Sequence, residues 1–380
     1  MTLKTWVEIT KKNILHNIGE IRSLLSGDTK FMAVVKSNAY GHGLLEVSNL
    51  CVGSKKVDWL GVDSIDEAMT LRRAKIKLPI LVIGFIPFHR LNEAIKNNVS
   101  FVAYNIELLK YLSKNFPKNV GNKKAKIHLK IETGISRQGI SDENLVAFVR
   151  EALKNKNILI EGAYTHFANV DDTTDFSYAN KQLDSYRKNI DKVEKLIKIS
   201  IKHTASSAAT INYPKTHFNM VRVGISMYGL WSSRETKLSS KERNIKIDLR
   251  PALTWKTLLV QIKKVVRGTP IGYGLTEKVK RDSVIGILPV GYWDGYDRGM
   301  SNIGEVLVRG ERAKVLGRIC MNMTIIDLTD IKDAKLFDEV VLLGKQNKDD
   351  ISADEIAGKL GTINYEIVTR ISPQIKRIVL

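Results

Sequence analysis

The sequence predicts an α/β protein in which an N-terminal (β/α)8 barrel of the TIM type precedes a C-terminal, mainly β domain. Over roughly the first 230 residues, strand-like runs alternate with helical stretches, as is typical of a closed parallel barrel. After about residue 240, helical periodicity gives way to short apolar runs separated by glycines and charged turns. The change of texture predicts two domains, at residues 1–240 and 241–380, with the option that the first ten or so residues join the β domain.

Eight short strand-like runs are the candidate barrel strands. They cover residues 31–35, 57–62, 79–84, 99–104, 125–131, 158–167, about 199–204 and 218–223. An open, doubly wound sheet is the alternative arrangement. No GxGxxG turn follows the first strand, however, so the barrel is favoured.

The helices between these runs carry start signals. Ser64 and Glu67 have the spacing of a capping box, and Asn105 is a typical N-cap before IELLKYLSKNF. Apolar residues three or four positions apart predict a helix over 181–202 with lysines on its other face. Its expected buried residues are Leu183, Tyr186, Ile190, Val193, Ile197 and Ile201.

In the second domain, five segments separated by turns are the expected strands. They lie within residues 249–265, 283–293, 304–310, 313–328 and 338–344. No low-complexity linker precedes them, so we expect the two domains to pack closely.

Composition excludes several classes of protein. The formal net charge of +20 could indicate nucleic acid or a membrane surface as partner, but the lysines are dispersed and no nucleic-acid-binding motif is recognisable. Two cysteines imply no disulfide framework. The N-terminus lacks a signal-peptide pattern, and no run of about 18 apolar residues occurs, which predicts a cytoplasmic protein. No HExxH or paired histidine spacing is present, so no metal is expected.

One lysine stands where barrel enzymes place their catalytic groups. The run at 31–35 ends in Lys36, followed by SNAYGHG, and catalytic groups of such barrels lie at the carboxyl ends of the strands. Partial desolvation there lowers the pKa of a lysine, and the neutral amine can form a Schiff base with an aldehyde cofactor.

The string AVVKSNAYGHG resembles the pyridoxal-phosphate lysine motif of the alanine racemases, of fold-type III. The resemblance runs through nearly the whole chain, in family order. Its other blocks are KIETGISRQGI, YTHFAN, HTASSAAT, NMVRVGISMYGL, IGYGLTE, LPVGYWDG, GRICMN and NYEIVTRIS. The resemblance implies a pyridoxal 5'-phosphate-dependent isomerase that interconverts L- and D-alanine and supplies D-alanine for peptidoglycan.

The resemblance also implies catalytic roles. Lys36 would hold the cofactor and remove the α-proton of the D-isomer, while Tyr273 would act on the L-isomer from the opposite face. A racemase needs an acid–base group on each side of the substrate. Arg222 would face the pyridine nitrogen and keep it unprotonated, because arginine is effectively always protonated. His166 would bond this arginine and lower the cost of the Tyr273 phenolate.

Further implied contacts concern the cofactor phosphate and the substrate. The phosphate ligands would be Tyr40, Ser207, Gly224 and Ile225. Arg137 and Met321 would bind the substrate carboxylate, and Tyr292 and Arg298 would line the corridor to the site. Lys130 would be carbamylated and paired with Arg137, with an ordinary strand lysine as the alternative. A homodimer in which Tyr273 completes the partner's site is implied as well.

Two positions depart from the family pattern. Asn322 stands where relatives usually have aspartate, and Pro373 stands where many have a tyrosine that narrows the entrance and reaches the phosphate. Both departures favour a racemase of broader specificity, for serine or other amino acids, as the alternative function. A non-catalytic pyridoxal-phosphate homeostasis protein would lack the second domain. A diamino-acid decarboxylase of the same fold-type would have an acidic residue in place of Arg222.

Overall fold

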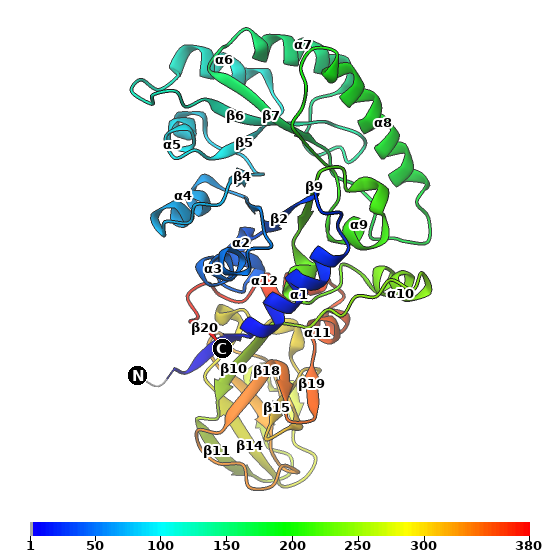
Figure 1. The fold of residues 1–380 in the computed structure, drawn as a ribbon. Helices are drawn as coiled ribbons and strands as arrows, with labels where there is room; N and C mark the ends of the chain where they lie inside the picture. The colour runs from blue at the N-terminus through cyan, green and yellow to red at the C-terminus, as the bar shows by residue number, and fades with distance from the viewer. Residues whose placement is uncertain (1–2) are drawn as a thin grey trace. The chain divides into compact units, whose positions relative to one another are not determined.

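The computed structural model describes residues 3–380, and residue contacts divide the chain into two compact units. The barrel unit comprises Ile14–Ala39 and Val47–Arg250. The β unit comprises Tyr40–Glu46, Pro251–Leu380 and the described residues up to Asn13. Figure 1 labels the elements of both. The segment Tyr40–Glu46, which begins four residues after Lys36, therefore belongs, by its contacts, with the C-terminal part of the chain.

Eight parallel strands form the sheet of the barrel unit, in the order β8-β7-β6-β5-β4-β3-β2-β9. The strands are β2 (Lys30–Val34), β3 (Trp59–Val62), β4 (Ile80–Val82), β5 (Ser100–Ala103), β6 (Ala125–Lys130), β7 (Ile158–Tyr164), β8 (Ile201–His203) and β9 (Met220–Val223). Each of the eight predicted strands is present at its predicted place. The predicted (β/α)8 barrel is confirmed.

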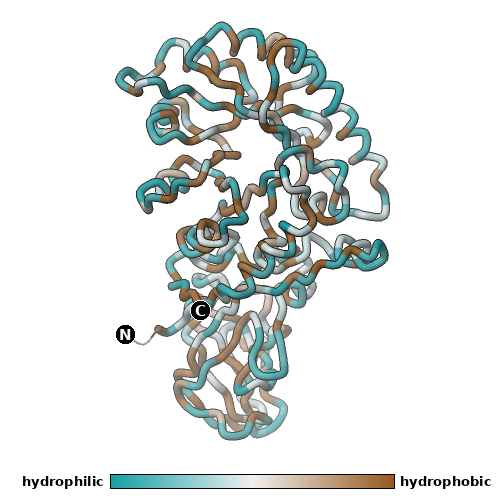
Figure 2. The backbone as a smooth tube through the Cα atoms, viewed as in Figure 1, coloured by the Kyte–Doolittle hydropathy of each residue, from teal (hydrophilic) through white to brown (hydrophobic). Residues whose placement is uncertain are grey.

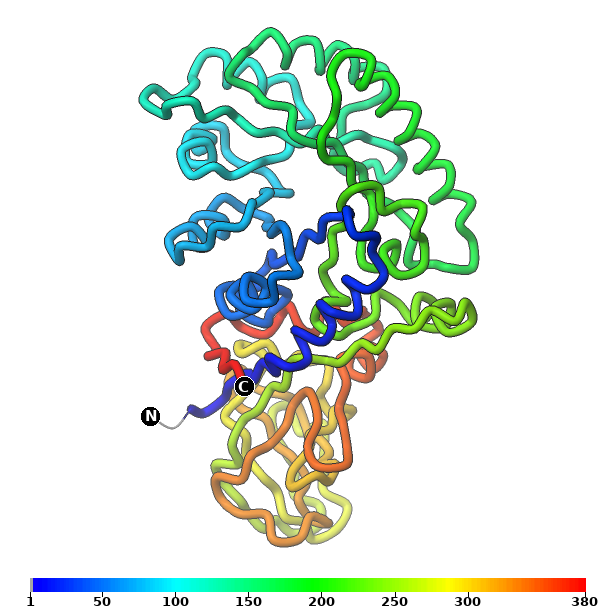
Figure 3. Tube along the Cα trace, in the orientation of Figure 1, coloured from blue at the N-terminus to red at the C-terminus, as the bar shows by residue number. Residues whose placement is uncertain are grey.

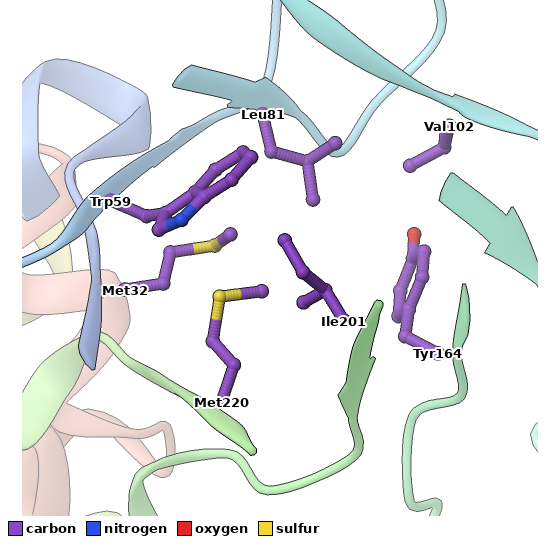
Figure 4. Packing of buried hydrophobic residues seen from close by; sticks show 7 residues of the cluster. All are labelled: Met32, Trp59, Leu81, Val102, Tyr164, Ile201 and Met220. Atoms are coloured by element: carbon purple, nitrogen blue, oxygen red, sulfur yellow. The ribbon is translucent and has the colours of Figure 1, made fainter. Parts of the chain in front are cut away.

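Residues from seven of these strands pack together as an apolar cluster (Figure 4). Its members are Met32, Trp59, Leu81, Val102, Tyr164, Ile201 and Met220. Burial of each large apolar side chain stabilises the fold by roughly 1.5–3 kcal/mol. The strand without a member in this cluster is β6, which has His128 opposite Val102 in the β5–β6 register.

Within residues 3–380, the two end strands of the sheet, β8 and β9, are not joined by a backbone ladder as the other neighbouring strands are. The side chain of Asn219 bridges the two instead. Its Oδ1 accepts from Lys202 N at 2.7 Å, and its Nδ2 donates to Ser200 O at 2.7 Å. One amide side chain thus supplies the donor and acceptor that a neighbouring strand would provide.

Helices follow most of the strands. They are α1 (Lys11–Ser23), α3 (Leu44–Ser54), α4 (Ile65–Arg73), α5 (Leu91–Lys96), α6 (Ile106–Asn115), α7 (Asp142–Leu153), α8 (Ser177–Glu194), α9 (Ser207–Asn212) and α10 (Arg234–Glu242). The capping box is confirmed, with Glu67 N donating to Ser64 Oγ at 3.2 Å, and Asn105 caps α6. Hydrophobic and hydrophilic segments alternate along α7 and α8 (Figure 2). Within residues 3–380, no helix is long and apolar enough to cross a membrane.

The helix predicted over 181–202 is partly wrong. Leu183, Tyr186, Ile190 and Val193 are buried on one face of α8, as expected. The helix ends at Glu194, however, and Ile201 is the first residue of β8. Ile201 is buried as a strand residue, and its spacing continues the helical period only by coincidence, which periodicity alone cannot reveal.

The β unit is mainly β, as predicted. Its main sheet has the order β16-β15-β18-β10-β1-β20, with β19 paired to β18; β11-β14-β17 and β12-β13 form two smaller sheets. The strands are β1 (Thr5–Ile9), β10 (Leu253–Leu258), β11 (Gln261–Val265), β12 (Pro270–Ile271), β13 (Glu277–Lys278), β14 (Ser283–Leu288), β15 (Glu305–Val308), β16 (Glu311–Lys314), β17 (Thr324–Asp327), β18 (Glu339–Gln346), β19 (Asp349–Ile351) and β20 (Arg377–Val379).

The two ends of the chain meet in that sheet. Strand β1 runs antiparallel to β10 and parallel to β20, so the blue and red ends of the trace lie side by side (Figure 3). Two helices in the β unit, α11 (Ala353–Leu360) and α12 (Asn364–Thr369), were not predicted. Ser352 caps α11 by accepting from Glu355 N at 3.0 Å, a signal that the sequence does contain.

Candidate active site

Lys36 lies just beyond the carboxyl end of β2, where its side chain is 39% exposed. Its Nζ is 3.4 Å from Asp63 Oδ1, at the end of the neighbouring strand β3. Glu67 joins the two strand ends, because its carboxylate accepts from Ser37 N at 2.6 Å and from Asp63 N at 2.8 Å. The capping-box glutamate therefore also orders the loop that carries the lysine.

The four residues after Lys36 form a left-handed turn. Ser37, Asn38, Ala39 and Tyr40 have φ values of 54°, 55°, 52° and 52°. Each costs roughly 1–2 kcal/mol relative to the right-handed conformation, and such strain is concentrated at functional sites. Gly41 follows at φ 82°, where a Cβ atom would lie 1.9 Å from Val368 O. The local sequence is thus constrained by backbone geometry as well as by side-chain chemistry.

Arg222 on β9 is a buried hub at the same end of the barrel. Its NH1 donates to His203 Nδ1 (2.9 Å) and to the His203 carbonyl (3.0 Å). Its NH2 donates to His166 Nδ1 (3.1 Å) and to the carbonyls of Thr165 and Thr204. Burial lowers the pKa of Arg222 to about 10, so the guanidinium stays charged at neutral pH. Its Nε–H is the one donor for which residues 3–380 supply no hydrogen-bond acceptor.

The histidines around Arg222 are neutral. Burial, reinforced by the charge of Arg222, lowers the pKa of His166 to about 3 and lowers that of His203 well below its usual value. Each accepts from the guanidinium at Nδ1, so each neutral ring carries its proton on Nε2. His166 therefore presents an Nε2–H donor.

Lys130 is the last residue of β6, and the positive charge of Arg137 acts on its amine. Burial, followed by the charges of Arg137, Arg222 and Lys36, lowers the pKa of Lys130 to about 8. Its Nζ donates to Gln138 Oε1 at 2.9 Å, and Arg137 is exposed on the same loop. A lysine with this pKa is partly neutral near physiological pH, which is a condition for reaction with carbon dioxide.

The residues predicted to bind a phosphate come together in part. Ser207 opens α9, and its Oγ accepts from Gly224 N at 3.1 Å and from Ser226 N at 3.5 Å. Ile225 begins the short helix η3 (Ile225–Tyr228) directly after Gly224. Tyr40 belongs to the β unit, where its ring lies 6.1 Å from that of Tyr365.

Tyr273 lies on a hairpin of the β unit, between β12 and β13, and is 70% exposed. The flanking Gly272 and Gly274 have φ values of 71° and 73°, which side chains rarely tolerate. A Cβ at Gly274 would also lie 2.8 Å from Arg318 NH1. The two glycines thus present the tyrosine at the tip of a tight turn.

A cavity of about 600 Å³ in the β unit is lined by all three residues predicted for the corridor, Tyr292, Arg298 and Pro373. Met321 is adjacent to this cavity wall, because Trp293 N donates to Met321 O at 3.0 Å and Tyr292 N donates to Cys320 O. Asn322 follows Met321 and is exposed.

The barrel end that carries Lys36 is electropositive. Lys36, Lys130, Arg137 and Arg222 all depress the pKa of His166, so their charges reach one point. Asp63 lies beside Lys36, Glu67 accepts from the next residue, Ser37, and Glu132 acts on Lys130. This arrangement can bind an anionic ligand and bring an amine next to it.

Several site residues escaped the sequence analysis. His203, Asp63 and Gln138 contact the predicted residues, yet none was assigned a role. A signal existed for β6, since its inward positions alternate as Lys126, His128 and Lys130 in a strand that is otherwise apolar. Such polar alternation indicates a functional interior.

Family models match both parts of the chain. "Alanine racemase, N-terminal domain" matches residues 9–232, and "Alanine racemase, C-terminal domain" matches residues 252–379. The chain is 41% identical over 377 residues to the alanine racemase of Methanococcus maripaludis, covering 99% of this chain and 98% of that one. It is 38% identical over 383 residues to that of Leptospira interrogans, covering 100% and 96%.

Solved structures agree with these matches. The alanine racemase of Clostridium difficile 630 superposes with a TM-score of 0.92 at 36% identity, covering 100% of this chain and 96% of that one. The Bacillus anthracis alanine racemase with bound L-Ala-P gives a TM-score of 0.93 at 34% identity, with the same coverage. The chain belongs to the alanine racemase family.

Proposed function

We propose that this protein interconverts L- and D-alanine, with pyridoxal 5'-phosphate as its cofactor. The observation that carries the proposal is the presence of Lys36 and Arg222 at one end of the barrel, after and within the hydrogen-bonded neighbours β2 and β9, where the charges of both act on His166. An amine that can bind an aldehyde would hold this cofactor, and a buried guanidinium with a free Nε–H would supply the partner of its ring nitrogen. D-alanine for peptidoglycan is the proposed use of the product.

The residues present fit this cofactor. Lys36 Nζ would hold the aldehyde carbon, and Arg222 Nε–H would donate to the pyridine nitrogen. Ser207, Gly224, Ile225 and Tyr40 would hold the phosphate. When bound, pyridoxal phosphate supplies an electron-withdrawing ring that stabilises the negative charge left on the substrate α-carbon. Because Arg222 remains charged, it would donate to the ring nitrogen and leave it unprotonated, which would favour reprotonation over side reactions.

Two groups would exchange the α-proton. Lys36 Nζ would take it from the D-isomer, and Tyr273 Oη would take it from the L-isomer on the opposite face. Tyrosine has an ordinary pKa near 10, so its phenolate needs a donor. His166 Nε2–H is a donor of the required kind, since Arg222 holds its Nδ1 as an acceptor. Arg137 and the Met321 backbone would bind the substrate carboxylate.

We infer that a second copy of the chain completes each site. Tyr273, Leu275, Trp293 and Met321 are each more than half exposed in the single chain. Large apolar side chains exposed near one another support an interface. In the resulting homodimer, Tyr273 of one subunit would serve the Lys36 of the other. A cytoplasmic location stays a prediction.

The decisive experiment follows conversion of L- to D-alanine and the reverse, with and without added pyridoxal phosphate. Wild-type protein should racemise in both directions, and borohydride reduction should fix the cofactor on the peptide that contains Lys36. Lys36→Ala should lose both signals, whereas Lys30→Ala, on the exposed start of the same strand, should keep both. Cofactor fixation without turnover would instead indicate a homeostasis protein, and fixation on another lysine would overturn the role of Lys36.

A further inference from the structure

A row of polar side chains crosses the otherwise apolar interior of the barrel. His128 occupies the β6 position beside the apolar cluster, with its ring centroid 5.6 Å from that of Trp59, and His203 on β8 is also fully buried. The His203 ring stacks on Tyr164, with centroids 4.8 Å apart. Burying polar groups costs free energy unless each is hydrogen-bonded. Each side chain of the row therefore needs a hydrogen-bond partner, and the presence of the row inside an apolar barrel indicates a function.

Hydrogen bonds connect the row from Arg222 to Glu161. His203 Nδ1 lies 2.9 Å from Arg222 NH1, and His203 Nε2 lies 2.9 Å from His128 Nδ1. His128 Nε2 lies 3.3 Å from Glu161 Oε2. The Arg222 guanidinium can only donate and the Glu161 carboxylate can only accept, so every hydrogen bond of the row is donated in the direction from Arg222 to Glu161. Each histidine therefore accepts at Nδ1 and donates at Nε2.

Local backbone features build the far end of this row. In the β6–β7 register, Ile127 faces Ile160 and His128 faces Gly162, which leaves Glu161 as an extra, bulged residue. Such bulges redirect side chains and are common beside active sites. A Cβ atom on Gly162 would lie 2.5 Å from His128 Nδ1, so the ring fits only against a glycine.

The charge states agree with this direction. Burial alone would raise the pKa of Glu161, but hydrogen bonds from His128 and Ser100 outweigh it, and the pKa lies below its usual value. Burial lowers the pKa of His128 and of His203. Lys126, 3.7 Å from Glu161, and Arg222 are the charged groups facing the row. At neutral pH it thus consists of a guanidinium, two neutral imidazoles and a carboxylate.

We propose that Glu161 and His128 are positioning residues that fix the proton of His128 on Nε2 and thereby hold His203 in the orientation that aligns Arg222. This inference rests on the proposed function, because Arg222 would be the group facing the cofactor ring. Without the carboxylate, the His128 proton can move to Nδ1, where it would oppose the Nε2–H of His203. The guanidinium would then lose one of its rigid supports.

The test combines a tautomer measurement with kinetics. In full-length protein labelled with ¹⁵N-histidine, with and without added pyridoxal phosphate, His128 and His203 should both show a protonated Nε2 and a bare Nδ1. Signals are assigned by their loss in His128→Gln and His203→Gln. Glu161→Leu should give mixed tautomers at His128 and a fall in kcat of roughly tenfold, a typical loss when a residue supporting a site ligand is removed. KM for alanine should change much less, because Arg222 does not bind the substrate carboxylate.

Matched variants separate positioning from general damage. Glu161→Gln retains an acceptor oxygen and should restore the wild-type tautomer and most of kcat. Glu194→Leu removes a carboxylate that pairs with Lys202 and should change neither signal. A proton on His128 Nδ1 in the wild type would overturn the proposal even if Glu161→Leu failed to fold, as would wild-type kcat in a folded Glu161→Leu protein. Absence of racemisation in the wild type would refute the proposed function instead. The tautomers measured without cofactor would still show in which direction the hydrogen bonds of the row are donated.

Discussion

Arg222 NH2 lies 3.1 Å from His166 Nδ1, and this contact fixes the chemistry of both residues. A guanidinium can only donate, so the imidazole must accept at Nδ1 and keep its proton on Nε2. Burial holds the pKa of His166 at about 3, and the ring stays neutral throughout the physiological range. One contact thus supplies a fixed donor for a neighbouring group and a fixed orientation for Arg222.

Arg222→Glu should change the course of the reaction more than the binding of substrate. An acidic partner would protonate the pyridine nitrogen and make the ring a stronger electron sink, so the charge on the substrate α-carbon would last longer. We expect more transamination per racemisation event, measured as pyruvate formed per turnover.

The matched control for this change is Arg250→Glu, because Arg250 is a half-exposed arginine that pairs with Asp248. Arg222→Gln, which removes the charge but not all donors, should fall between wild type and Arg222→Glu. An unchanged ratio of pyruvate to racemised alanine in a folded Arg222→Glu protein would show that Arg222 does not face the ring.

Tyr273→Phe should keep the cofactor and lose turnover in both directions. Phenylalanine preserves the ring and removes the hydroxyl that would exchange the proton on that face. Even a tenfold loss corresponds to about 1.4 kcal/mol of barrier, and we expect a larger one. The measurement is kcat in each direction beside the cofactor content; Tyr178→Phe, at another exposed tyrosine, is the control. Near-normal rates would assign the second base to another group.

Lys130 should react with carbon dioxide. Its pKa of about 8 leaves part of the amine neutral at pH 7.5 and most of it neutral at pH 9, and only the neutral amine forms a carbamate. Adding ¹³C-bicarbonate should give a carbamate ¹³C NMR signal that rises with pH over this range and disappears in Lys130→Ala. Lys126→Ala, four residues earlier on the same strand, should keep the signal. Persistence of the signal in Lys130→Ala would place the carbamate elsewhere.

The barrel was predictable because its strands are short apolar runs separated by helices with clear caps, such as those at Ser64 and Asn105. The end of α8 was not, since Ile201 continues the helical spacing although it lies in β8. The helices α11 and α12 were also not predicted, because both are short and follow many strand-like segments in a domain predicted to be mainly β. Local periodicity carries element type well and element boundaries poorly.

For the candidate site, the sequence predicted residues that lie in distinctive local motifs, such as Lys36 after β2 and Tyr273 between two glycines. It did not predict Asp63 or His203, whose importance arises only from which strands are neighbours. Glu161 shows the limit most clearly. A regular strand would place it on the opposite face from Gly162, and only the bulge brings its carboxylate to His128.

Substrate range should depend on Pro373, which lines the cavity of the β unit together with Tyr292 and Arg298. Proline leaves space that a phenol ring would fill, so we expect the wild type to racemise serine beside alanine. Pro373→Tyr should raise the ratio of kcat/KM for L-alanine over L-serine by roughly tenfold, the low end of what one small group contributes in a pocket. Gln374→Tyr adds the same ring at the next residue of the cavity wall and is the control. If Pro373→Tyr leaves the ratio unchanged, position 373 does not set the specificity. If Gln374→Tyr raises the ratio equally, the effect comes from added bulk anywhere in the cavity and not from position 373.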